Sequence, residues 1–206
     1  MLSIVARPMR AGPTHPEDSV TSSPFTDYTP DSAPAGSRPV LAAMARQQGH
    51  VPAAVARLAA SPQLLNGFLK ASGLFENTSL DPIAREVVVL TIATRNRCHI
   101  CVAMHTERLG ALGASPDLIA ALREQRPLPD ERLAVLQEFV LDIVATAGGV
   151  SPESLEAFLG HGYTAENALE VVLGIGTYTM STLANRLVRA PLDDRLMAFA
   201  WLEPVA

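Results

Sequence analysis

The chain has 206 residues, enough for one ordinary domain with a sizeable core; 48% of its residues are hydrophobic and 18% are charged. The net charge of −5 and the lack of a Lys/Arg cluster argue against a nucleic-acid surface. No apolar run is long enough to span a membrane, and the N-terminal sequence MLSIVARPMRAGP has no apolar segment typical of a secretory signal. We therefore expect a cytoplasmic protein that binds neither nucleic acid nor membrane.

Residues 1–38 are predicted to form a flexible N-terminal extension and arm, and residues 39–206 a single helical domain. Seven of the sixteen prolines fall in the first 40 residues, mixed with Ser, Thr, Asp and Gly. Such a segment buries too little apolar surface to offset its ordering entropy, so residues 1–22 are expected to be disordered. For residues 23–38 the alternative is that Phe25, Tyr28 and Val40 hold the arm against a neighbouring surface.

The rest of the chain is predicted to be all-α. VLAAMARQQGH and VPAAVARLAA are separated by Gly49-His50 and Pro52. Helix starts with an N-cap followed by proline recur at Ser61, Asp81, Ser115 and Ser151, and no period-2 strand pattern accompanies them.

Two later segments complete the predicted domain. ERLAVLQEFVLDIVATAGG has apolar residues at 133, 136, 139, 140, 143 and 144, which predicts an amphipathic helix ended by Gly148-Gly149. AENALEVVLGIGTYTMSTLANRLVRAPLDDRL is more apolar and is predicted to be central. Its Gly174 and Gly176 lack the third glycine and the βαβ context of a dinucleotide fingerprint, so they are interpreted as sites of close helix approach.

The reactive side chains concentrate in EVVVLTIATRNRCHICVAMH, residues 86–105. Cys98 and Cys101, the only cysteines, form a C-x-x-C pair, and His105 lies four residues after Cys101. On one helix these three residues share a side, and two cysteines so spaced can form a disulfide. Asn96 is predicted to be the N-cap of that helix, which would start near Arg97. Arg95 and Arg97 are expected to add positive potential that lowers a thiol pKa.

Glu86 requires a turn to join this group. In one continuous helix it would lie about 18 Å along the axis from Cys98. If the chain reverses near residues 95–97, two antiparallel helices bring Glu86 beside residues near 105, where a carboxylate could orient His105 for proton transfer.

Two chemistries remain open at this point. In the first, one thiol attacks an oxidant and the other closes a disulfide. In the second, Cys98, Cys101 and His105 bind a metal such as zinc, although ligands on one helix converge poorly on a tetrahedral centre. A non-catalytic redox sensor or metal-binding module stays an alternative, and the expected site contains no metal and no cofactor.

The spacing Glu86-x11-Cys98-x2-Cys101-x3-His105 resembles the signature of the AhpD-like alkylhydroperoxidase branch of the carboxymuconolactone decarboxylase family. The surrounding REVVVLTIATRNRCHICVAMHT, the later VVLGIGTYTMSTLANRL and the arm YTPDSAPAGSRPVL are similar to that family, from about residue 24 onward. Residues 1–23 are interpreted as an extra extension.

The resemblance implies an all-helical, homotrimeric or homohexameric peroxidase that reduces alkyl hydroperoxides and is regenerated by a dithiol reductant protein. It implies that Cys101 attacks the peroxide, that Cys98 resolves the sulfenic acid as a disulfide, and that Glu86 and His105 relay protons. The sequence departs from the family at Ile100, where members can carry a second relay histidine. A decarboxylase-like lyase is the alternative enzyme, although that branch does not need a cysteine pair.

Overall fold

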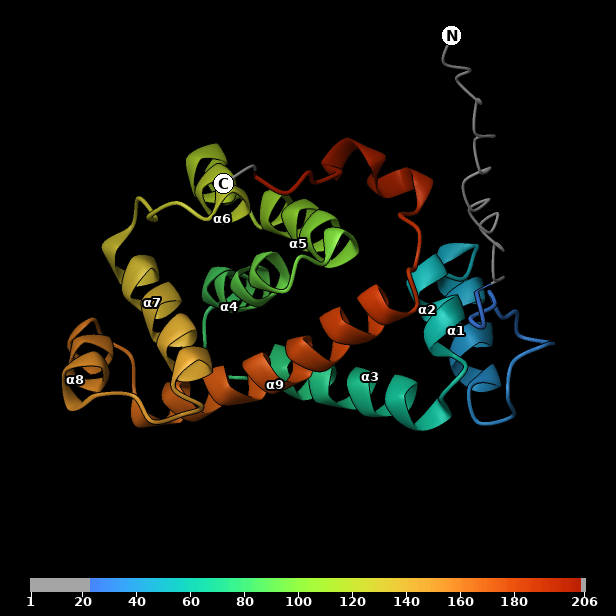
Figure 1. The fold of residues 1–206 in the computed structure, drawn as a ribbon, viewed down its shortest axis with the longest axis horizontal. Coiled ribbons are helices and arrows are strands. Elements are labelled where there is room, and N and C mark those ends of the chain that lie inside the picture. The colour runs from blue at the N-terminus through green and yellow to red at the C-terminus, as the bar shows by residue number, and fades with distance from the viewer. Residues whose placement is uncertain (1–22, 205–206) are drawn as a thin grey trace, which may run out of the picture.

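The computed structural model describes residues 23–204, and these residues form helices and connecting segments without a strand (Figure 1). The all-α prediction is confirmed. In chain order the elements are α1 (Arg38–Gln48), α2 (Ala53–Leu58), α3 (Pro62–Glu76), α4 (Pro82–Arg95), α5 (His99–Ala111), α6 (Pro116–Glu124), α7 (Glu131–Ala145), α8 (Pro152–Gly160), α9 (Ala165–Leu187) and the 3₁₀ helix η1 (Asp194–Phe199).

The predicted helix starts are confirmed. Side-chain oxygens of Ser61, Asp81, Ser115 and Ser151 each accept a hydrogen bond from the backbone N–H three residues on, and proline occupies the first helical position each time. These caps satisfy N–H groups that an isolated helix start leaves without partners. The amphipathic helix predicted around residues 133–144 is α7, and its buried side includes Leu133, Leu136, Phe139, Val140 and Ile143.

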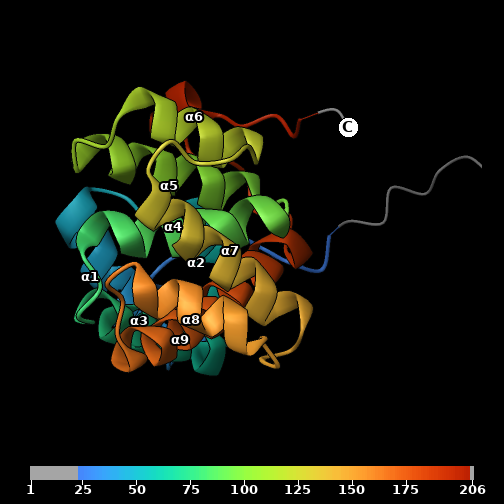
Figure 2. The ribbon, with the colours of Figure 1, turned by 90° about the vertical axis from the view of Figure 1, so that its left-hand side faces the viewer.

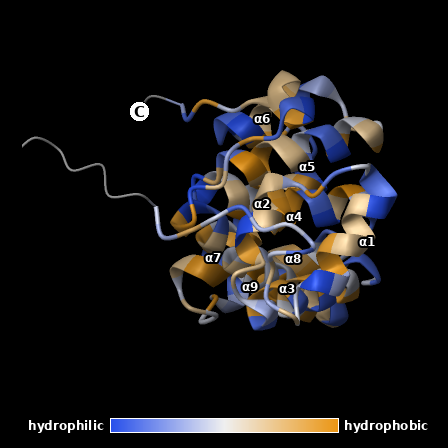
Figure 3. Cartoon of the chain, turned by 90° about the vertical axis from the view of Figure 1, so that its right-hand side faces the viewer, coloured by the Kyte–Doolittle hydropathy of each residue, from blue (hydrophilic) through white to orange (hydrophobic). Residues whose placement is uncertain are grey.

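Helix α4 lies at the centre of the domain, packed against α5, α7 and α9 (Figures 1 and 2). Every residue from Val87 to Thr94 is buried, so this helix is apolar around nearly its whole circumference, as expected of a core helix. The other helices carry hydrophilic residues beside hydrophobic ones (Figure 3), which suits helices that bury only one side.

The longest helix, α9, has 23 residues and crosses both α3 and α4. Its Gly174 is a site of close approach, because a Cβ there would lie 2.6 Å from the Phe75 ring and 3.0 Å from Val88. The same prediction is wrong for Gly176, where a Cβ would meet nothing within 4 Å. Only one of the two glycines therefore serves helix packing.

Residues 23–37 lie against α2 and the start of α3. The Tyr28 N–H donates to the Ala56 carbonyl at 3.2 Å, and the buried Ser37 hydroxyl donates to the Ala59 carbonyl at 2.8 Å. Phe25 and Tyr28 pack, partly buried, against the core. The disorder predicted for residues 1–22 lies outside the described residues.

After α9 the chain crosses α5 and α6 through η1. Arg195 pairs with Glu107 at 2.8 Å, and the indole N–H of Trp201 donates to the Arg123 carbonyl at 2.9 Å. Among the described helices, none combines the length and hydropathy needed to cross a membrane.

Candidate thiol site

A tight turn between α4 and α5 places the cysteines. The N–H of Arg97 donates to Thr94 O and that of Cys98 to Ala93 O, both at 2.9 Å, and Arg97 has a left-handed φ of 55°. This is the Schellman pattern of a helix end, and it reverses the chain so that α5 returns along α4. The predicted cap at Asn96 is wrong, because Asn96 ends α4 and Cys98 is the N-cap of α5.

The two sulfur atoms lie 3.0 Å apart as free thiols. Both residues are buried, with exposures of 1% for Cys98 and 3% for Cys101. In the single chain, Cys98 is therefore no nearer to the solvent than Cys101. The pair is arranged so that little movement is needed for a disulfide to form.

The two thiols differ in their tendency to ionise. A hydrogen bond with Cys101 and the backbone N–H groups of Cys101 and Ile100 lower the pKa of Cys98, against the effect of its burial. The hydrogen bond with Cys98 and burial raise the pKa of Cys101 well above its usual value.

The predicted placement of Glu86 beside His105 is confirmed. The His105 Nδ1–H donates to Glu86 Oε2 at 2.6 Å, and Arg108 Nε lies 3.0 Å from Glu86 Oε1. Arg108 also pairs with Glu76 of α3. Glu86 is only 1% exposed, and a buried carboxylate of this kind needs such partners to offset its desolvation.

Helix α9 supplies polar groups that the sequence reasoning missed. Tyr178, Ser181 and Asn185 are spaced at i, i+3 and i+7, a helical spacing that could have indicated a shared face. Asn185 Nδ2 lies 3.5 Å from both Cys101 Sγ and Ser181 Oγ, and Asn185 Oδ1 is buried without a hydrogen-bond partner. Buried polar atoms without partners are rare, so this carboxamide is a distinctive part of the site.

Tyr178 packs edge-on against the His105 ring, with the ring centroids 5.2 Å apart. Burial raises the pKa of the Tyr178 hydroxyl to about 12, so the group stays protonated at neutral pH. Among residues 23–204, the hydrogen-bond partner of the His105 ring is Glu86, and neither sulfur bonds to that ring. The ring is held in place by Glu86 and Tyr178 rather than by the thiols.

The arginine whose charge lowers a thiol pKa is neither Arg95 nor Arg97, the two that the sequence suggested. Arg97 points to Glu203, with Nε 2.7 Å from Oε1, and Arg95 lines a cavity elsewhere. Arg186 of α9 donates to the Asn96 carbonyl at 2.9 Å, and its charge contributes to lowering the pKa of Cys98. Because this arginine comes from a distant part of the sequence, neighbour spacing could not identify it.

Cys98, Cys101 and His105 do not form a metal site in this geometry. Within the described part of the chain, no three His, Cys, Asp or Glu side chains converge in a way that could hold a metal ion.

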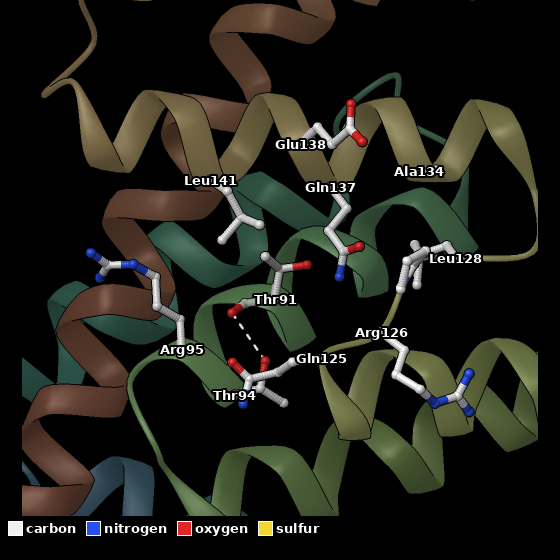
Figure 4. Close-up of a pocket in the computed structure, with 11 residues that line it drawn as sticks. Thr91, Thr94, Arg95, Gln125, Arg126, Leu128, Ala134, Gln137, Glu138 and Leu141 are labelled. Carbon is white, nitrogen blue, oxygen red and sulfur yellow. Dashed lines mark hydrogen bonds between the residues drawn. The ribbon is translucent and has the colours of Figure 1, made fainter. Parts of the chain in front are cut away.

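A cavity of about 330 Å³ opens on another side of α4, towards α7 and the connection that follows α6. Its lining includes Thr91, Thr94, Arg95, Gln137 and Glu138 but neither cysteine. Figure 4 shows Gln137 and Leu141 of α7 pointing towards Thr91, while the guanidinium of Arg126 points away. The Thr91 and Thr94 hydroxyls donate to backbone carbonyls of their own helix, which leaves this cavity without a nucleophile.

Taken together, the fold and the site define an all-helical protein with a buried dithiol at the start of one helix and a paired Glu–His on the same helical hairpin. Residues 59–130 match the model of the carboxymuconolactone decarboxylase family, and the predicted family resemblance is confirmed over this segment, which contains Glu86, Cys98, Cys101 and His105. A comparison with curated protein sequences gives no match.

Solved structures share the fold. The chain is similar to a peroxidase-related protein from Ralstonia eutropha JMP134, described as an alkylhydroperoxidase AhpD core, with TM-score 0.72 and 19% identity over 84% of this chain and 93% of that one. A peroxidase-related protein from Silicibacter sp. TM1040 gives TM-score 0.68 and 18% identity over 90% and 97%. A protein of unknown function from Agrobacterium tumefaciens gives 0.53 and 21% over 65% and 94%.

Proposed function

We propose that this chain is a thiol-dependent peroxidase that reduces alkyl hydroperoxides by oxidising Cys98 and Cys101 to a disulfide. The observation that carries the proposal is the 3.0 Å separation of two free sulfurs at the start of α5. A helix N-terminus favours a thiolate, and a thiolate is the form that attacks peroxides. A dithiol so close together can complete the reduction without a bound cofactor.

The chemistry balances within the site. One thiolate attacks the outer peroxide oxygen, so that an S–O bond forms while the O–O bond breaks and an alkoxide leaves with a proton. The second thiolate then attacks the sulfenic sulfur, forms the S–S bond and displaces hydroxide, which becomes water. The products are an alcohol, water and one disulfide.

Glu86 and His105 are proposed to move the protons. The hydrogen bond at 2.6 Å holds His105 in one tautomer and orientation, as a general acid or base requires. Arg108 and its second partner Glu76 hold the carboxylate in place. Regeneration requires an external dithiol, and a dithiol reductant protein is the proposed partner class.

The comparisons support the same activity. The family model covers the motif, and two structural relatives are described as peroxidase-related. The homotrimer or homohexamer implied by the resemblance stays a prediction.

A stoichiometric experiment tests the function. Reduced protein is mixed with one equivalent of tert-butyl hydroperoxide, and the intact mass is measured before and after. We expect a loss of two hydrogens per chain, mapped by peptide analysis to a bond between Cys98 and Cys101, together with one equivalent of tert-butanol. Unchanged thiols with intact peroxide would contradict the proposal.

The same protein sample separates the lyase alternative. A decarboxylase acting on a muconolactone would release carbon dioxide without changing the oxidation state of either cysteine. Alkylating both thiols should abolish the peroxidase reaction, so lactone turnover by the alkylated protein would favour the lyase instead.

A further inference from the structure

We propose that the side-chain amide of Asn185 binds the hydroxyl end of the hydroperoxide beside Cys101, with its oxygen accepting a hydrogen bond from the O–H group that the sulfur attacks. The inference rests on the proposed function and adds a substrate contact to it, from the helix α9 that lies outside the cysteine motif. It comes from one buried oxygen atom that has no partner and from the atoms around it.

Asn185 is only 5% exposed. Among the described residues, two buried side-chain atoms have no hydrogen-bond partner, Arg85 Nε and Asn185 Oδ1. The Arg85 guanidinium still donates to the Leu80 carbonyl at 2.6 Å, whereas Oδ1 is the only strong acceptor of the Asn185 side chain. A buried acceptor without a donor destabilises a fold, so a ligand that brings a donor to this oxygen is favoured.

A second buried asparagine of α9 shows the contrast. Asn167 is 8% exposed, and its Oδ1 accepts from the Thr164 N–H at 3.0 Å. Its Nδ2 donates to Ser79 Oγ at 2.7 Å and to Glu170 Oε2 at 2.9 Å. The fold therefore uses both polar atoms of the Asn167 amide, whereas it uses only the nitrogen of Asn185.

That nitrogen fixes the distance between the free oxygen and the thiol. Asn185 Nδ2 lies 3.5 Å from Cys101 Sγ. The oxygen and nitrogen of a planar amide are about 2.2 Å apart, so Oδ1 lies within about 6 Å of the sulfur. One oxygen atom can contact both, at about 2.8 Å from Oδ1 as a donor and at about 3.3 Å from the sulfur as the atom under attack. The separation therefore suits the hydroxyl oxygen of one hydroperoxide.

The contact also fits the bonds that change. The Cys101 thiolate forms an S–O bond with the hydroxyl oxygen while the O–O bond breaks, and the alkoxide that leaves takes a proton from His105 to become an alcohol. The hydrogen on the attacked oxygen is not transferred, so its bond to Asn185 persists from the hydroperoxide to the sulfenic acid. Before the attack, hydrogen bonds from Asn185 and Ser181 lower the pKa of Cys101, against Cys98 and burial, which raise it.

Two reagents separate binding of the hydroxyl group from activation of the sulfur. The test uses a C98S background, where only Cys101 can react, and follows the loss of its thiol. The hydroperoxide tert-butyl hydroperoxide presents an O–H group, whereas methyl methanethiosulfonate reacts with a thiolate and has no hydrogen-bond donor. We expect N185L to slow the first reaction about tenfold more than the second, as the loss of one neutral hydrogen bond predicts. Equal slowing with both reagents, or slowing with neither, would overturn the proposal.

N167A is the matched control, because it removes a buried amide of the same helix about 27 Å away along the axis. It should leave the ratio of the two rates unchanged, and a change as large as that in N185L would overturn the proposal. Thermal unfolding identifies any variant that has lost its fold, and N185A or C98A then replaces it. If Cys101 in C98S resists the hydroperoxide although the wild type forms the disulfide, the proposal fails and the peroxidase function stands. If the wild type forms no disulfide with the hydroperoxide, the proposed function itself fails.

Discussion

Two carboxylates of the α4 region, Glu86 within the helix and Asp81 at its N-cap, each pair with an arginine, and the two pairs have different surroundings. Towards α5, Glu86 is 1% exposed and bonds to both His105 and Arg108. At the start of the helix, Asp81 pairs with Arg132 of α7 at 2.9 Å, and both of these side chains are 44% exposed. The buried pair is therefore important for the fold, whereas water can replace the interactions of the exposed pair.

The comparison extends to the spaces beside the helix. The described cavity towards α7 has room for a small molecule but no nucleophile (Figure 4), whereas the thiol side contains the reactive groups in a closed core. The more open side and the more reactive side of this helix are therefore different, and the size of an opening alone would point to the wrong side.

The largest expected effect is on catalysis. Replacing either Cys98 or Cys101 by serine should abolish formation of the intramolecular disulfide on addition of tert-butyl hydroperoxide, because one of its two sulfurs is missing. Glu138→Gln, on the cavity side, should leave disulfide formation unchanged, since exposed substitutions away from the site have little effect. Thiol counts before and after the peroxide, with no other thiol present, measure both, and equal losses would refute the distinction between the two sides.

The next effect is on stability. Glu86→Gln removes the buried charge that holds Arg108 and His105, and should lower the free energy of unfolding by about 3 kcal/mol. Urea unfolding followed by circular dichroism measures the change. Glu138→Gln makes the same chemical change at an exposed position of α7 and should have no measurable effect. A similarly small decrease in the free energy of unfolding for both variants would show that the Glu86 carboxylate does not stabilise the fold.

A smaller effect is expected where α9 packs on the thiol side. Gly174→Ala drives a methyl group into the Phe75 ring and should cost about 1–3 kcal/mol. Gly176→Ala, on an open side of the same helix, should stabilise by about 0.5–1 kcal/mol through helix propensity. Denaturant unfolding of the two variants checks both signs, and a gain for Gly174→Ala would contradict the close approach.

The smallest effect concerns Asp81. Burial raises its pKa, but hydrogen bonds from the Ala84 N–H and Arg132 outweigh this, and the net shift is downward. The folded chain thus binds this proton less tightly than the unfolded one. The stabilisation is complete above the unfolded pKa of about 3.9 and is lost as the pH falls through the lower folded value.

Asp81→Asn keeps an N-cap side chain but loses the ion pair. The substitution should lower the free energy of unfolding by about 0.5 kcal/mol at neutral pH. Below the folded pKa of Asp81 it should have no effect, because the wild-type carboxyl group is protonated there. Unfolding curves at neutral pH and at a series of pH values below about 3.9 would show the two proteins converging as the pH falls. A constant difference between the two proteins would mean that the charge contributes nothing.

Local signals in the sequence predicted most of the fold. The N-cap residues before proline predicted four helix starts because a capping oxygen and a fixed proline φ act within one turn. The Glu86–His105 contact also followed once a reversal near residues 95–97 was assumed. The turn itself uses a left-handed arginine, Arg97, and no glycine indicates it.

What could not be predicted depends on contacts between distant segments. Arg186 and Asn185 reach the cysteines from α9, 84 or more residues along the chain. The environment of Cys101 depends on those groups and on burial, which the cysteine spacing does not show. The cysteine spacing identifies the pair, but only the packing distinguishes its members.

The docking of the last described segment has a practical consequence. Trp201 is the only tryptophan of the chain; it is 8% exposed, and two residues later Glu203 pairs with Arg97, next to Cys98 in the sequence. Tryptophan emission therefore arises from a single side chain, in a segment tethered to the turn that precedes Cys98. Stopped-flow emission can follow any movement of that turn during oxidation, with no dye attached.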